Sequence, residues 1–348
     1  MKTKYSPLLK GKNGELRALT NLSEMTRHLI TPLIDLTEVT PTKTLSAYLK
    51  IKIKQIAKAW NSSDPIFIDL HDLDYTKLTS DGRHALECIA SEIKENNLQA
   101  ILCTGLGRGD AYQGSLGKVL NTNGSVCIRL EFEDLVTFDL KNLENFLKKL
   151  KISEKNTHIF LDFRSINDEN FASCLRLVKA VTPLLLKNKY SSVTVAGSSN
   201  LENLNDLDKG MNSVRRREVD LWNAIKLTTN LTESIRYGDY GVVYPEPREL
   251  PEDIDFTVVD MLAKLRYSLA EETLIFKGKG MKKFGNSQFV GFCKSLIADE
   301  NYFGRDCCWG DKYIFDCSNG LASPGNLMTW ISVGTNHHLT LMADILKK

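Results

Sequence analysis

Ionisable side chains follow three strongly apolar runs of this sequence, at nearly the same point in each. The residues concerned are Asp69, His71 and Asp72 after the first run, Arg129 and Glu131 in the second, and Asp162 and Arg164 in the third. Near-continuous apolar runs are typical of parallel strands that are buried on both faces. Because α/β folds place ligand sites at the carboxyl ends of such strands, we expect these side chains to meet in one site.

Carboxylates held close to a histidine suit proton transfer, because neighbouring charges shift each other's pKa. We therefore predict catalytic roles for four residues: Asp69, His71, Glu131 and Asp162. An oxygen-rich site of this kind also attracts Mg²⁺ or Mn²⁺, although the residues do not identify a metal. The alternative interpretation is that these acids and bases neutralise one another as buried ion pairs, since charges inside a fold must be paired or hydrated.

A second set of residues carries charge that suits an anionic ligand. Arg108 lies in a glycine-rich stretch, residues 105–110, whose backbone N–H groups could cradle a phosphate, although the Lys-Ser/Thr ending of a P-loop is missing. Lys277 and Lys279 belong to a lysine-rich patch that suits a nucleic-acid backbone or else forms a solvated turn. The residues predicted to contact a ligand are Lys10, Lys12, Asp35, Arg108, Arg129, Arg164, Asp239, Lys277 and Lys279.

Strand-like and helix-like segments alternate through the first 250 residues. The eight predicted strands are residues 5–9, 30–36, 66–70, 100–104, 126–132, 158–163, 193–197 and 240–244. Eight strands separated by helices predict a (β/α)8 TIM-type barrel over residues 1–250. An open doubly wound sheet is the alternative, but no glycine-rich dinucleotide fingerprint follows the first strand.

Three prolines between Pro245 and Pro251 mark a boundary, after which the pattern changes. Residues 251–348 are predicted to form an α+β appendage that packs on the barrel. Within it we expect a hairpin around Ala270, a helix over 287–298 and a strand over 312–317. The helical pattern over 328–346 contains Gly334, which we expect to interrupt it. Of the neighbouring His337 and His338, we expect one in the core and one at the surface.

Composition is that of an ordinary soluble protein, with a net charge of +2 that steers the chain to neither nucleic acid nor membrane. The first residues contain no apolar stretch that resembles a signal peptide, so we expect a cytoplasmic protein that does not associate with membranes. The cysteines show no Cys-x-x-Cys pair and no matched Cys/His spacing. Reduced thiols are therefore expected in place of a zinc site.

Short motifs spread over the chain resemble those of the phage beta-protein family. They include the opening Tyr5–Lys12, the Ile30–Leu33 strand, Gly238–Tyr240, Lys264–Tyr267, Trp309–Asp311 and Asn336–His338. The resemblance covers nearly the whole chain and implies a role in phage–host conflict, in phages or in bacterial mobile or defence loci. It implies no reaction and transfers no catalytic residue.

Three hypotheses of function follow. The first is a component of phage–host conflict, acting in antiphage defence or as its phage-encoded counterpart, that binds an anionic, phosphorylated ligand at the barrel mouth. The second is a metal-assisted phosphoesterase or nuclease-like hydrolase that uses the carboxylates and His71. The third is a scaffold that docks a protein partner encoded nearby. The ligand is expected to be an anionic small molecule or a nucleic acid, and fold alone does not choose among the three hypotheses.

Overall fold

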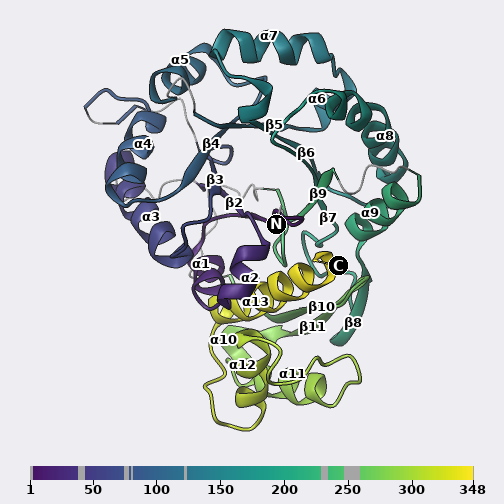
Figure 1. Cartoon of the computed structure of the whole chain (residues 1–348). Helices are drawn as coiled ribbons and strands as arrows, with labels where there is room; N and C mark the ends of the chain where they lie inside the picture. The colour runs from purple at the N-terminus through teal and green to yellow at the C-terminus, as the bar shows by residue number, and fades with distance from the viewer. Residues whose placement is uncertain are drawn as a thin grey trace.

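The computed structural model of the chain describes residues 3–37, 44–73, 78–79, 81–120, 124–228, 234–246 and 259–347. Eight parallel strands surround a central axis, and helices form a ring outside them (Figure 1). The barrel strands are β1 (Leu8–Leu9), β2 (Leu33–Asp35), β3 (Ile66–Asp69), β4 (Ala100–Thr104), β5 (Val126–Leu130), β6 (Thr157–Ser165), β7 (Ser192–Ser198) and β9 (Ile235–Asp239). Each strand pairs with the next in this order, which confirms the predicted α/β barrel.

The residues just before β1 join the two ends of this sheet. Tyr5 forms a parallel bridge to Ile30 on one side and to Tyr237 of β9 on the other. The amide of Ser6 donates to the carbonyl of Tyr237 at 2.9 Å, and the amide of Tyr237 donates to the carbonyl of Lys4 at 2.9 Å. The N-terminal segment therefore closes the ring against the last barrel strand.

Helices that connect the barrel strands bury one apolar face against the outside of the sheet. They are α1 (Asn13–Thr20), α2 (Glu24–Leu29), α3 (Leu45–Trp60), α4 (Ala85–Glu95), α5 (Asp110–Val119), α6 (Phe132–Val136), α7 (Leu140–Leu150), α8 (Phe171–Lys187) and α9 (Arg217–Thr228), with a 3-10 turn η1 (Glu154–Asn156). In α3, for example, the Oγ of Thr44 caps the first turn, and Asn61 ends the helix in a left-handed conformation. Between these ends, Leu49, Ile53 and Ile56 repeat at helical spacing and are fully buried.

Side chains inside the barrel form two layers. The apolar layer consists of Leu8, Leu33, Phe67, Cys103, Cys127, Phe160, Ala196 and Tyr240. Successive side chains of a strand point to opposite faces, so residues two positions further along also face the axis. These residues are Lys10, Asp35, Asp69, Arg129 and Asp162, and they place a charged layer at the carboxyl end of the barrel.

A second, antiparallel sheet lies beside the barrel and takes strands from both predicted regions. It consists of β10 (Leu262–Ser268), β11 (Glu272–Gly280) and β8 (Gly210–Arg215), in that order. β10 and β11 form the hairpin predicted around Ala270, whereas β8 comes from the connection between β7 and α9. The second sheet is therefore built partly from the first 250 residues.

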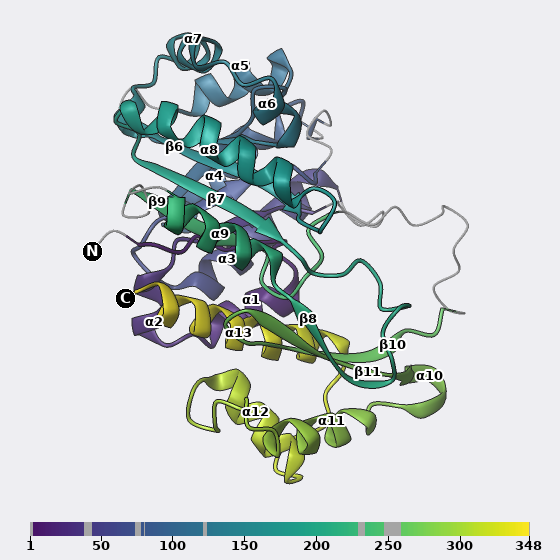
Figure 2. The same cartoon turned by 90° about the vertical axis from the view of Figure 1, so that its right-hand side faces the viewer.

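Helix α13 (Leu327–Leu346) lies between the barrel and this second sheet, with α10 (Met281–Phe284), α11 (Gln288–Ile297) and α12 (Trp309–Ser318) on the far side (Figures 1 and 2). The middle of α13 is buried all round, and both His337 and His338 lie in the core, so the expectation of one surface histidine was wrong. Gly334 does not interrupt the helix. A Cβ there would lie 2.8 Å from the carbonyl oxygen of Arg266, so glycine allows α13 to approach β10.

Two predicted strands were also wrong. The eighth barrel strand is β9, at Ile235–Asp239, and residues 241–243 after it form turns. Gly238 within β9 lies where a Cβ would be 2.8 Å from the Cβ of Ala196, a close approach that an apolar pattern does not reveal. Residues 312–317, predicted as a strand, belong to α12, in which Ile314 and Cys317 are buried at helical spacing.

Candidate functional site at the barrel mouth

Arg129 of β5 is the centre of the charged layer and has no solvent exposure. Its Nε donates to Asp162 at 2.8 Å, and Nη1 donates to Asp35 at 3.0 Å and to Asp69 at 2.9 Å. Its Nη2 lies 2.9 Å from the hydroxyl of Tyr240 and 2.8 Å from Asp162. All five N–H groups of this guanidinium therefore have acceptors inside the barrel.

Two further cations complete this inner layer. The two terminal nitrogens of Arg108 lie 2.5 and 2.9 Å from the carboxylate oxygens of Asp69, and Nη1 also donates to the hydroxyl of Tyr112. The ammonium of Lys10 lies 2.5 Å from Asp72 and 3.7 Å from Asp35. Both cations are at least nine-tenths buried. Arg108 therefore serves as an internal counterion, although the glycine-rich stretch that carries it suggested a phosphate loop.

Three aspartates of the mouth, Asp69, Asp72 and Asp35, differ in how strongly their surroundings stabilise the charged form. Burial raises the pKa of Asp69, but Arg108 and Arg129 outweigh it and hold that pKa far below the usual range. The pKa of Asp72 is also lowered, because its bonds to His71 and Lys10 outweigh burial. Burial and the neighbouring charges of Asp69 and Asp72 instead raise the pKa of Asp35. Asp69 is thus fixed as an anion and is unsuited to accept a proton.

An outer layer, which we call the rim, consists of His71, Glu131, Arg164 and Glu246. The Nε2 of His71 lies 2.7 Å from Glu131, and Arg164 donates to Glu131 at 2.8 Å and to Glu246 at 2.9 Å. The side chains of His71, Glu131 and Glu246 are 26%, 31% and 36% exposed. The rim is therefore the part of the mouth that solvent and a solute can reach.

His71 occupies a position in which two protonation forms compete. Its Nδ1 lies 3.2 Å from Asp72 and 2.7 Å from Nη2 of Arg164. This nitrogen donates to Asp72 when the ring is protonated and accepts from Arg164 when the ring is neutral. Burial lowers the pKa of His71, but the hydrogen bonds to Asp72 and Glu131 outweigh it and raise that pKa above its ordinary value. The pKa of Glu131 is lowered to about 2, because its bond to His71 outweighs burial.

Arg164 has a left-handed backbone, with φ of 48°, within the stretch between Asp162 and Ser165 where the pairing of β6 with β7 shifts register. Its amide donates to Asp162 at 2.9 Å, which fixes this turn to the charged layer. A non-glycine residue in this conformation costs roughly 1–3 kcal/mol, and such strain is concentrated at functional sites. The backbone thus directs the Arg164 guanidinium across the rim.

The other residues predicted to contact a ligand lie elsewhere. Asp239 faces outward from β9 and is buried against Arg216 and α13. Lys12 is exposed at the start of α1. On β11, Lys277 donates to the carbonyl of Leu207, and Lys279 lies over the ring of Phe284. These four side chains do not join the charged layer or the rim.

Three side chains of the mouth could hold a cation. Asp35, His71 and Asp72 each offer one ligand atom within 4.8 Å of the others, and oxygen and imidazole ligands suit Mn²⁺ better than soft metals. However, the ammonium of Lys10 already lies beside both carboxylates. A divalent cation would have to displace that ammonium, so the fit to Mg²⁺ or Mn²⁺ is poor.

Sequence patterns did not reveal two members of the mouth. The hydroxyl of Tyr240 donates to Asp162 at 2.5 Å and accepts from Arg129, although Tyr240 was assigned to the eighth strand. Glu246 pairs with Arg164 across 82 residues of sequence. Tyr240 lies two residues after Gly238 of β9, and side chains two positions apart on a strand share a face. This spacing was the signal that could have placed Tyr240 at the barrel mouth.

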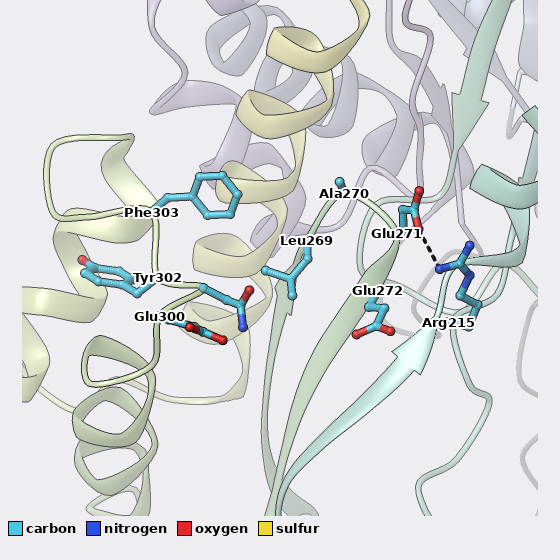
Figure 3. A pocket seen from close by; sticks show the side chains of 9 residues that line it. Arg215, Leu269, Ala270, Glu271, Glu272, Glu300, Tyr302 and Phe303 are labelled. Carbon is cyan, nitrogen blue, oxygen red and sulfur yellow. Dashed lines mark hydrogen bonds and ion pairs between the residues drawn. The ribbon is translucent and has the colours of Figure 1, made fainter. Parts of the chain in front are cut away.

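A separate open cavity of about 470 Å³ lies in the C-terminal region (Figure 3). One wall is the segment with Glu300, Tyr302 and Phe303, and the other is the turn between β10 and β11 with Glu271. Arg215 of β8 pairs with Glu271 at 2.8 Å along this wall. The cavity contains none of the residues predicted from sequence as a site.

The fold and site together define an α/β barrel protein with a charged mouth at the carboxyl ends of its strands. The family model described as Beta protein matches residues 5–344, so the chain belongs to the Beta protein family. No curated protein and no solved structure matches the chain. Among the described residues, no helix combines the length and apolar character needed to cross a membrane.

Proposed function

We propose that the rim of the barrel mouth binds a small anionic ligand that carries a phosphate group. Arg164 supplies the main contact, and protonated His71 supplies the second. The observation that carries the proposal is the strained, left-handed backbone of Arg164, which holds a guanidinium among partners that solvent can reach. A planar guanidinium suits phosphate because it donates two parallel hydrogen bonds.

The partners of Arg164 are exchangeable, in contrast with those of Arg129. Glu131 and Glu246 are 31% and 36% exposed, so their ion pairs with Arg164 are more open to solvent than the fully buried pairs of Arg129. A phosphate oxygen can therefore replace the Glu246 carboxylate more readily than it could replace the carboxylates around Arg129. Whether or not they stay paired with Arg164, Glu131 and Glu246 can accept hydrogen bonds from hydroxyl groups of a nucleotide or sugar phosphate.

The biological setting that we propose is phage–host conflict, in defence or as a phage-encoded counterpart, which rests on the family alone. Expression of the gene in a susceptible host, followed by phage challenge, tests it. Wild-type protein should change the efficiency of plaque formation, and Arg164→Gln should abolish the change. An unchanged efficiency over a broad phage panel, with protein present at normal level, would contradict this setting.

Direct binding measurements test the ligand. We would titrate phosphate, nucleoside monophosphates and sugar phosphates into the protein by calorimetry. Arg164→Gln should weaken binding roughly 10- to 100-fold, because a hydrogen bond to a charged group is worth about 1.5–3 kcal/mol. Glu246→Gln should strengthen it, since the internal competitor is gone.

The matched control is the pair Lys277→Gln and Lys279→Gln, which removes two cations outside the mouth. Affinity should be retained in this double variant. Loss of binding there, with normal binding by Arg164→Gln, would move the ligand site to β11 and overturn the proposal.

A second candidate, the metal-assisted phosphoester hydrolase, is favoured by the ligand atoms of Asp35, His71 and Asp72 within 4.8 Å of one another. The same titrations with Mg²⁺ or Mn²⁺ present, followed for release of phosphate, distinguish the two. Metal-dependent release that Lys10→Met accelerates would favour the hydrolase, because that variant removes the ammonium beside the carboxylates.

A further inference from the structure

Three potential metal ligands converge in the C-terminal region, outside the barrel mouth. Cys308, Asp311 and His337 each offer one ligand atom within 4.8 Å of the others. The Sγ of Cys308 lies 3.0 Å from Oδ2 of Asp311, and Nδ1 of His337 lies 2.8 Å from the same oxygen. We propose that these side chains, with Cys307 as the fourth ligand, bind Zn²⁺. Thiolate, imidazole and carboxylate are the ligands that zinc takes in proteins, usually four in number.

The hydrogen bonds of His337 direct its Nδ1 at the carboxylate of Asp311. Its Nε2 lies 2.8 Å from the carbonyl oxygen of Ser268, which only accepts, so this nitrogen carries a hydrogen. Its Nδ1 therefore directs either a lone pair or a second proton at the Asp311 carboxylate. A proton on Nδ1 satisfies this contact as an imidazolium–carboxylate pair, and a zinc ion that replaced that proton would bind the same nitrogen and the same carboxylate.

The surroundings of the three ligands match the outer shell of a metal site. Metal-binding histidines usually donate their second ring nitrogen to a carbonyl or carboxylate, as His337 does to Ser268. The free oxygen of Asp311, Oδ1, accepts from the hydroxyl of Tyr267 at 2.7 Å. The ring of Tyr267 also stacks on the imidazole with centroids 3.9 Å apart. Both buried ligands are thus oriented before an ion arrives.

The fold brings the ligands together through a close contact between two helices. A Cβ on Gly310 would lie 2.5 Å from the carbonyl oxygen of Val333, so glycine at this position lets α12 touch α13. Its amide also donates to Asn336 at 3.0 Å. This contact sets Asp311 on α12 against His337 on α13. Bound zinc would therefore cross-link the two helices.

Cys307 gives the site an open side. It is exposed and adjoins Cys308 in the sequence, whereas Asp311 and His337 are completely buried. Tyr302 and Phe303, which line the cavity of Figure 3, also lie near the ligands, with the Phe303 ring 5.5 Å from His337 and the Tyr302 hydroxyl donating to the carbonyl of Asp311. On binding, each thiol releases one proton to solvent, and any proton on Nδ1 of His337 leaves as well.

Cobalt titration of the full-length protein, purified with chelator and reductant, tests the site. Co²⁺ should bind with one equivalent per chain and give a thiolate-to-cobalt charge-transfer band with the visible spectrum of a tetrahedral ion. Zn²⁺ should displace it and raise the melting temperature. Cys308→Ser should weaken binding about 100-fold or more, and Tyr267→Phe about 10-fold, since loss of an outer-shell partner costs 10- to 100-fold in affinity.

Cys174→Ser is the matched control, because Cys174 is a buried thiol of α8 outside this cluster and its loss should leave the spectrum unchanged. The wild-type titration alone can overturn the proposal, whatever the variants do. Absence of the charge-transfer band in folded wild-type protein would do so. A band that persists in the double variant Cys307→Ser and Cys308→Ser would also exclude this site.

Discussion

Nε2 of His338 lies 2.8 Å from Oδ2 of Asp239, so the long helix α13 is bonded to the final residue of the last barrel strand. Asp239 also accepts from Tyr5 at 2.7 Å and from Arg216 at 3.3 Å. Tyr5 belongs to the N-terminal segment, Arg216 directly precedes α9, and His338 belongs to α13. One buried carboxylate thus connects the barrel closure to the C-terminal region.

We predict that Asp239→Asn lowers the free energy of unfolding by about 3 kcal/mol, because removal of one member of a buried ion pair leaves the other charge uncompensated. Chemical denaturation of the whole chain measures this loss. The control is Asp306→Asn, since Asp306 is 93% exposed and its change should stay within about 0.5 kcal/mol. Equal stability of the two variants would show that the connection is energetically unimportant.

The charged layer offers a comparison between two aspartates that share Arg129. Asp69→Asn should cost about 3 kcal/mol, because the two arginines that hold its pKa low lose their anion. Asp35→Asn should cost clearly less, since the raised pKa of Asp35 shows that its charged form is poorly stabilised there. Urea denaturation of both variants at neutral pH gives the comparison. The reverse order would contradict these assignments.

Protonation of His71 should contribute to stability in a pH-dependent way. Its pKa is raised in the folded state, so its contribution is fully present below the unfolded value of about 6.5 and is lost as the pH rises through the folded value. Unfolding free energies measured from about pH 6 to about pH 9 should therefore fall more steeply for wild type than for His71→Gln. Parallel curves would indicate a neutral ring that accepts from Arg164.

The left-handed backbone of Arg164 predicts an unusual order of variants. Arg164→Gly should be more stable than Arg164→Ala by about 1 kcal/mol, because glycine adopts positive φ without strain while alanine keeps the strain and loses the ion pairs. Thermal and chemical denaturation of the two variants measures the difference. Both variants should lose the proposed anion binding, so they should differ in stability while binding the anion equally poorly. A less stable glycine variant would mean that the turn relaxes when the side chain is removed.

The barrel could be predicted from the sequence because its strands are local apolar runs. The charged layer could be predicted because the carboxyl ends of parallel strands converge. The ion pairs within that layer could not be predicted, because Arg129 bonds to Asp35 across 94 residues of sequence and to Asp69 across 60. Spacing likewise concealed the proposed zinc ligands, since Asp311 and His337 are 26 residues apart on two different helices. The strand predicted over 312–317 failed because its alternating pattern is also compatible with one buried helix face.

The bridge from Tyr5 to Tyr237 has a consequence for synthesis on the ribosome. The edge of the first strand has no partner until β9 has been made, and α13 is needed later still to cover Asp239. At roughly 5–20 residues per second, the nascent chain spends ten seconds or more as an open sheet with unpaired edges. Such edges invite pairing with other chains, so the yield of folded protein should depend on chaperones that shield this intermediate.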